Sequence, residues 1–180
     1  MFGNRRIGKA NEVVNEFIKI ANFSPNGSHG ALLRFGEKAM LEVEFSDQLD
    51  LDSYAEAINR TIEKGPLAGG TEIINALDIS LNRMFQTSSG MREDALQVAV
   101  LITDGTDNNP TNKNEYIEIG QVFKKRQIKM LVVGVAATDD EDLKQLVQSP
   151  EHFFKADKFE DLIGNVTEVI GALICQGIIL

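Results

Sequence analysis

The sequence contains few of the residues that make covalent cross-links, metal cages or membrane spans. Cys175 is the single cysteine among 180 residues, so no disulfide can form within the chain. Neither His29 nor His152 has a cysteine or a second histidine at the spacing of a zinc site. No apolar stretch approaches the roughly 20 residues of a membrane span. Residues 1–10 also lack the apolar core of a signal peptide.

Basic residues are scarce relative to acidic ones. Lys and Arg total 18 against 27 Asp and Glu, which gives a formal net charge of −9. Because phosphate binding needs a basic surface, this balance argues against nucleic acid as a general partner. Hydrophobic residues make up 43% of the chain, which argues against disorder. We predict that residues 1–180 form one domain with a substantial core.

Motifs of catalysis are also missing. The sequence contains neither G-x-G-x-x-G nor the complete phosphate-binding loop G-x-x-x-x-G-K-[ST], and it shows no Ser-His-Asp arrangement. We therefore predict that the protein is not an enzyme. A small α/β hydrolase or phosphatase with Asp104 as nucleophile is the weakest alternative, because basic residues that would support such chemistry are lacking near Asp104.

The most informative stretch is Val98–Ile102, an unbroken apolar run that Thr103-Asp104-Gly105 ends. Such a run predicts a central strand buried on both faces. Asp104 then lies at the carboxyl end of that strand, where open α/β sheets bind ligands. Its carboxylate either caps the following loop or helix, or provides a hard oxygen ligand for a divalent cation.

Helix and strand patterns alternate along the rest of the chain. Helical spacing is found at residues 7–20, 52–62, 72–85, 115–126, 139–147 and 159–174, and strand patterns at 31–35, 40–45, 129–135 and 152–154. Thr71 stands at the expected N-cap of the helix 72–85, after Gly69-Gly70. This order predicts a three-layer, doubly wound α/β fold: a mostly parallel sheet, one antiparallel edge strand, and helices on both faces.

Three segments together resemble one known family. GGTEIINAL, AVLITDG, and MLVVGVA followed by an acidic helix and HFFKADKFEDL occur in the order found in the von Willebrand factor A-type domain, also called the integrin inserted domain. The resemblance implies the Rossmann-like fold of that family. It also implies that the first central strand of the sheet precedes Met1, so that the domain is incomplete at its N-terminus.

In this family, a metal-ion-dependent adhesion site takes its ligands from three loops. They are an Asp-x-Ser-x-Ser segment, a Thr after Gly-Gly, and an Asp before Gly. The resemblance assigns the second position to Thr71 and the third to Asp104. A hard cation held there by about six oxygens would capture a carboxylate of a partner.

The first element of this metal site departs from the family pattern. Aligning Ile7-Gly8 with the family places Phe2, Asn4 and Arg6 where the Asp and the two Ser would stand. We therefore expect Mg²⁺ or Mn²⁺ binding to be impaired. Two explanations stay open. The chain is either a fragment or a gene product with a wrongly assigned start and altered residues near it, or it is a real variant whose metal site is inactive. In the second, the Arg6 guanidinium would pair with Asp104 in place of the ion.

The resemblance implies an adhesion or extracellular-matrix module that binds a protein ligand, such as collagen or another matrix component. The expected ligand-binding surface includes Asn4, Arg6, Gly69, Gly70 and Asp107. An extracellular location within a longer parent protein follows, where Cys175 either pairs with an upstream cysteine or stays a free thiol. The alternative is a cytoplasmic scaffold subunit of a multiprotein complex, which suits the lack of a signal peptide.

Overall fold

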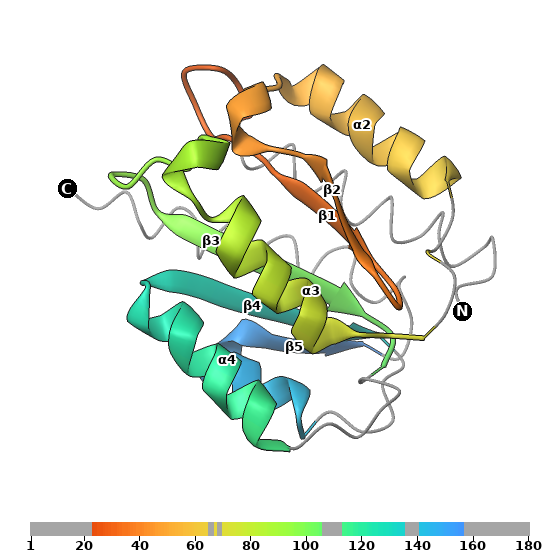
Figure 1. The fold of residues 1–180 in the computed structure, drawn as a ribbon, viewed down its shortest axis with the longest axis vertical. Coiled ribbons are helices and arrows are strands. Elements are labelled where there is room, and N and C mark those ends of the chain that lie inside the picture. Colours follow the sequence, from red (N-terminus) through yellow and green to blue (C-terminus); the bar gives the residue numbers. More distant parts are fainter. Residues whose placement is uncertain (1–22, 65–66, 68–69, 106–112, 136–140, 157–180) are drawn as a thin grey trace.

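The computed structural model describes residues 23–64, 67, 70–105, 113–135 and 141–156. The strands are β1 (Leu32–Phe35), β2 (Ala39–Val43), β3 (Gln97–Thr103), β4 (Ile128–Val135) and β5 (Phe153–Ala156). The α-helices are α2 (Leu51–Glu63), α3 (Ile73–Ile79) and α4 (Lys113–Lys125). A parallel sheet with helices and an antiparallel pair confirm the predicted α/β class (Figure 1). The helices predicted at 7–20 and 159–174 lie outside the described residues.

The parallel sheet has the order β3-β4-β5. β3 runs in register with β4 from Gln97 opposite Ile128 to Thr103 opposite Gly134, and α4 forms the crossover between them. β4 is buried at every residue except Lys129, as its apolar run predicts. β5 pairs only with Val132–Val135, so the first part of β4 has no strand on that side. There the side-chain amide of Gln148 satisfies two backbone groups of β4. Its Oε1 accepts from Met130 N–H at 2.9 Å, and its Nε2 donates to Ile128 C=O at 3.2 Å.

The hairpin is a separate antiparallel pair, β1-β2, closed by a turn in which Gly36 N–H donates to Lys38 C=O. Its sequence predicts it, because two short apolar runs flank Gly36-Glu37-Lys38. A small core lies under α2 and contains Phe23, Val43, Tyr54, Ala57 and Ile58. The Tyr54 hydroxyl donates to Ala31 C=O at 2.8 Å, and the rings of Phe23 and Tyr54 stack at 4.6 Å.

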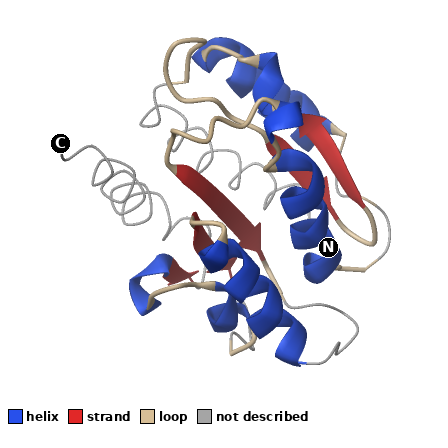
Figure 2. Cartoon of the chain, turned by 60° about the vertical axis from the view of Figure 1, so that its left-hand side comes forward, coloured by secondary structure: helices blue, strands red, loops and turns tan. Residues whose placement is uncertain are grey.

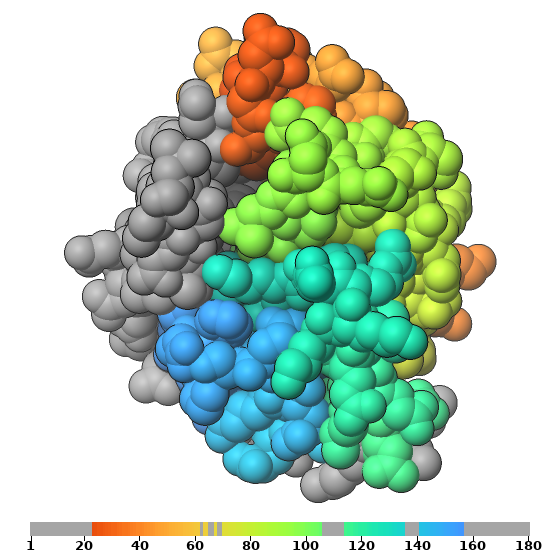
Figure 3. All heavy atoms as spheres, turned by 90° about the vertical axis from the view of Figure 1, so that its left-hand side faces the viewer, coloured from red at the N-terminus to blue at the C-terminus, as the bar shows by residue number. Residues whose placement is uncertain are grey.

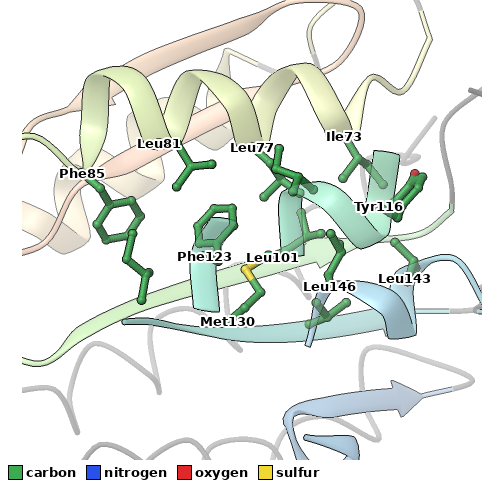
Figure 4. Packing of buried hydrophobic residues seen from close by; sticks show 13 residues of the cluster. Ile73, Leu77, Leu81, Phe85, Leu101, Tyr116, Phe123, Met130, Leu143 and Leu146 are labelled. Atoms are coloured by element: carbon green, nitrogen blue, oxygen red, sulfur yellow. The ribbon is translucent and has the colours of Figure 1, made fainter. Parts of the chain in front are cut away.

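The main core lies between α3, α4 and the parallel sheet (Figure 4). One face of α3 and of the π-helical turn that extends it, Ser80–Met84, presents four of the labelled residues at helical spacing: Ile73, Leu77, Leu81 and Phe85. They face Phe123 of α4 and Met130 of β4, both fully buried, and Leu101 of β3. Phe35 of the hairpin packs against the same core, so α3 joins the hairpin to the sheet. Figure 2 shows this arrangement from a second direction.

The end of the extended α3 helix is tied to α4 by Arg126. Its guanidinium donates to the carbonyls of Leu81 and Phe85. The Leu81 carbonyl also accepts from the side-chain amide of Gln86. In space-filling form, the segment 70–105 lies between the hairpin region at one end and residues 113–156 at the other (Figure 3).

β3 differs from its prediction in one respect. It was expected to be central and buried on both faces, but only Leu101 and Thr103 are buried, and the other five residues are half-buried. The physical reason is its position. In the described part of the chain, β3 is the outer strand of the three-stranded sheet, and no ladder joins it to β1.

Glu42 of β2 joins the hairpin to the end of α2, and this pairing makes stability depend on pH. Its side chain is 9% exposed and accepts from Arg34 at 2.8 Å and from Lys64 at 2.5 Å. The hydrogen bond from Lys64 is the main cause that lowers the pKa of Glu42 below its ordinary 4.5, against the opposing effect of burial. A lowered pKa contributes stability above about pH 4.5 that is lost as the pH falls.

We expect Glu42→Gln to reduce the free energy of unfolding by about 1 kcal/mol at pH 7. The variant should also lose less stability than the parent between pH 5 and pH 3, as urea unfolding would measure. Glu37→Gln, at an exposed position in the hairpin turn, is the matched control and should behave like the parent. Equal acid sensitivity of the parent and Glu42→Gln would contradict the prediction.

Candidate functional site

The turn after β3 presents Asp104 at the carboxyl end of the strand, as predicted. Thr103 is 3% exposed, and its Oγ1 donates to Gly105 C=O at 2.8 Å and accepts from Gly105 N–H at 3.3 Å. These bonds fold the chain back immediately after the sheet, while Asp104 stays partly exposed. Sequence reasoning missed the part played by Thr103, although hydroxyl residues commonly shape turns in this way.

The loop before α3 contains Gly70 and Thr71, both partly exposed. The prediction that Thr71 is the N-cap is wrong, because Glu72 occupies that position and no side-chain bond caps the helix. Glu72 N–H instead donates to Gly36 C=O of the hairpin turn at 3.0 Å, and its own carbonyl accepts from Ala76 N–H. The bond to the hairpin holds Glu72 outside the helix and leaves Thr71 in the loop.

Figure 1 shows the carboxyl end of β3 and the start of α3 at the same end of the sheet. The described part of the predicted surface therefore consists of Gly70, Thr71 and Asp104, with the hairpin turn beside the loop. An added Cβ at Gly105 would meet no heavy atom of the described residues within 4 Å. The other predicted residues, Phe2, Asn4, Arg6, Gly69 and Asp107, lie outside the described residues.

The described part of the predicted site supplies few oxygen ligands. Thr71 and Asp104 offer one hydroxyl and one carboxylate, whereas a hard cation takes about six oxygens. Within the described ranges, no three His, Cys, Asp or Glu residues are grouped to hold a metal ion. No helix in those ranges is long and apolar enough to cross a membrane.

Comparisons with known proteins identify relatives of this chain. The model of the von Willebrand factor type A domain matches residues 2–169. The chain is 21% identical to the collagen alpha-1(XII) chain of Notophthalmus viridescens over 98% of its length, and 24% identical to human matrilin-3 over 92%. It spans 19% of that collagen chain and 34% of matrilin-3.

Solved structures agree on the fold. Proximal thread matrix protein 1 of the mussel byssus superimposes with a TM-score of 0.84 at 16% identity, which covers 96% of this chain and 43% of that one. Another structure of the same mussel protein holds zinc in its metal-ion-dependent adhesion motif. Because the family model covers nearly the whole chain, and the fold and the order of its motifs agree with it, this chain belongs to the von Willebrand factor type A domain family.

Proposed function

We propose that this chain is a protein-binding domain of an extracellular matrix or adhesion protein, and that it acts by binding and not by catalysis. The observation that carries the proposal is the family match, together with relatives that include a collagen chain and a matrilin. The recognition surface is the carboxyl edge of the sheet around Thr71 and Asp104. Its other members are Asn4, Arg6, Gly69, Gly70 and Asp107.

Metal dependence is impaired in this proposal. Thr71 and Asp104 supply two of the oxygens of the family site, but Phe2, Asn4 and Arg6 stand where its carboxylate and serine ligands would be. The aromatic side chain of Phe2 offers no oxygen, and the cation of Arg6 would repel a metal ion. Recognition therefore rests on direct polar contacts of Asp104 and the neighbouring backbone.

Thermal unfolding with Mn²⁺ and then with chelator tests the impaired site. A functional site at tenfold ligand excess over its Kd would add about 1.4 kcal/mol, which is about 3–6 °C in Tm for a domain of this size. We expect a difference of less than about 1 °C between the two conditions. A shift of several degrees would contradict the proposal of impairment.

Binding to immobilised triple-helical collagen tests the ligand surface. We expect saturable binding that chelator leaves unchanged, and about tenfold weaker binding by Asp104→Asn, equivalent to about 1.4 kcal/mol. Asp94→Asn is the matched control, because Asp94 is exposed before the amino end of β3. Equal losses in the two variants would exclude the carboxyl edge, and no binding by the parent would exclude collagen as the ligand.

A further inference from the structure

Four segments of the sequence match the acceptor pattern for N-linked sugars, Asn-x-Ser/Thr with x other than proline. Two of them lie wholly within the described residues, Asn26-Gly27-Ser28 and Asn59-Arg60-Thr61. The asparagines of the other two, Asn22 and Asn165, lie outside the described residues. The ligand surface proposed above uses none of these segments.

Asn26 is exposed at the tip of a turn that precedes β1. Gly27 N–H donates to Ser24 C=O at 3.0 Å, which closes a β-turn with Pro25 and Asn26 at its two central positions. Proline is favoured at the first of these positions because its ring presets φ. Behind the tip, Ser24 N–H donates to Ser28 C=O at 3.2 Å. The turn is therefore closed by backbone bonds, and the Asn26 side chain is left at the surface.

Contacts on both sides hold this turn against the domain. Phe23, directly before the turn, is buried in the small core and stacks on Tyr54. On the other side, the Arg92 guanidinium donates to Gly27 C=O at 2.8 Å. A group attached to Asn26 would thus extend from a fixed point of the domain.

The position of the turn keeps such a group away from the proposed ligand surface. Arg92, which holds Gly27, precedes β3, so the turn lies at the amino end of that strand. Asp104 lies at the opposite, carboxyl end (Figure 1). A bulky, hydrophilic sugar on Asn26 would cover the amino end of the sheet and leave the carboxyl edge free.

The second described pattern lies inside a helix. Asn59 is exposed on α2, but Thr61, which would supply the hydroxyl of the pattern, is 8% exposed. Acceptor asparagines are typical of surface loops. Asn26 meets this condition, and Ser28, the hydroxyl residue of its pattern, is partly exposed.

We propose that Asn26 is a glycosylation site and carries an N-linked sugar chain. The inference rests on the extracellular part of the proposed function, because this modification takes place in the secretory route. It adds that the amino end of the sheet is covered by carbohydrate and is not a protein-binding face.

The co-substrate of this modification is an oligosaccharide joined through a diphosphate to a lipid. A bond forms between Nδ2 of Asn26 and C1 of the first sugar, while the bond between C1 and the phosphate oxygen breaks. The lipid diphosphate leaves, and it takes up the proton that the amide nitrogen loses. No oxidant or reductant is needed.

The test produces the full chain behind a cleavable signal peptide in animal cells, with the same chain from bacterial cytosol as the reference without sugar. Secreted and cell-retained chains are both analysed, so that poor secretion does not hide the result. We expect the animal-cell chain to lose mass on treatment with peptide N-glycosidase. Trypsin releases residues 20–34 as one peptide that contains both Asn22 and Asn26. Electron-transfer fragmentation of this peptide should place a sugar on Asn26.

Substitutions within the pattern separate its recognition from other effects. Asn26→Gln removes the acceptor nitrogen, and Ser28→Ala keeps the asparagine but removes the hydroxyl, so each should abolish the sugar at position 26. Ser28→Thr retains a hydroxyl and should keep it. Asn59→Gln is the matched control at another exposed asparagine and should leave the sugar on Asn26 unchanged.

Two results would overturn the proposal. They are a parent chain without sugar on Asn26 in both the secreted and the retained fractions, and a Ser28→Ala variant with as much sugar there as the parent. Collagen binding enters neither readout. A chain that carries the sugar but does not bind collagen would support this inference and exclude only the proposed ligand.

Discussion

Gly30→Ala is expected to reduce the free energy of unfolding by about 2–3 kcal/mol. Gly30 is buried against two stacked rings, and a Cβ there would lie 2.5 Å from Phe23 Cε1 and 2.7 Å from Tyr54 Cζ. The rings cannot move apart cheaply, because Tyr54 is 6% exposed and its hydroxyl is bound to Ala31 C=O. Urea unfolding would measure the loss, which corresponds to roughly 4–12 °C in Tm.

Gly105→Ala is the matched control for this prediction. It makes the same chemical change at a position where an added Cβ meets none of the described residues within 4 Å. We therefore expect it to be neutral or to stabilise slightly through the unfolded state. A Gly30→Ala variant as stable as Gly105→Ala would show that the rings do not pack as described.

Gln148→Leu is expected to reduce the free energy of unfolding by about 3 kcal/mol. The two backbone groups that Gln148 satisfies belong to Met130 and Ile128, which are 0% and 2% exposed. A leucine of similar volume leaves both groups without a partner in an apolar surrounding, and each such group costs about 1–3 kcal/mol. Chemical denaturation of the two proteins would measure the difference.

Gln148→Glu separates hydrogen bonding from shape. A carboxylate can still accept from Met130 N–H, but it cannot donate to Ile128 C=O and faces that oxygen with negative charge. We expect destabilisation at pH 7 that lessens when the carboxyl is protonated at low pH, whereas the loss in Gln148→Leu does not recover there. If the stability of both variants relative to the parent recovers at low pH, or that of neither does, the two hydrogen bonds of Gln148 do not account for its contribution.

The sequence predicts the elements well because their signals are local. Four elements agree with their predicted ranges to within two residues: β3, β4, α2 and α4. Each is an apolar run or a helical repeat that turn residues end. The segment predicted as a short helix to Val147 forms a 3-10 turn, Leu143–Leu146, in the part of it that is described.

Features set by distant residues escaped prediction. Thr71 fails to cap α3 because the amide of Glu72 bonds to Gly36, which lies far away in sequence. The partial exposure of β3 depends on its neighbours in the sheet, which its own sequence cannot specify. Gln148 bonds to residues 18 and 20 positions away, and nothing in its own neighbourhood signals this. Asp104 was placed correctly because its position depends only on where β3 ends.

The division of the described strands into two sheets also has a mechanical consequence. A force that pulls the hairpin away from β3 loads no ladder of hydrogen bonds in the described structure, only the side-chain packing beneath α3 and single contacts such as Glu72 to Gly36. β3, β4 and β5, by contrast, are held to one another by continuous ladders. Among the described elements, the boundary between hairpin and sheet is thus held without a hydrogen-bond ladder, and we expect a stretching force to separate the hairpin and α2 from β3 before it separates β3, β4 and β5 from one another.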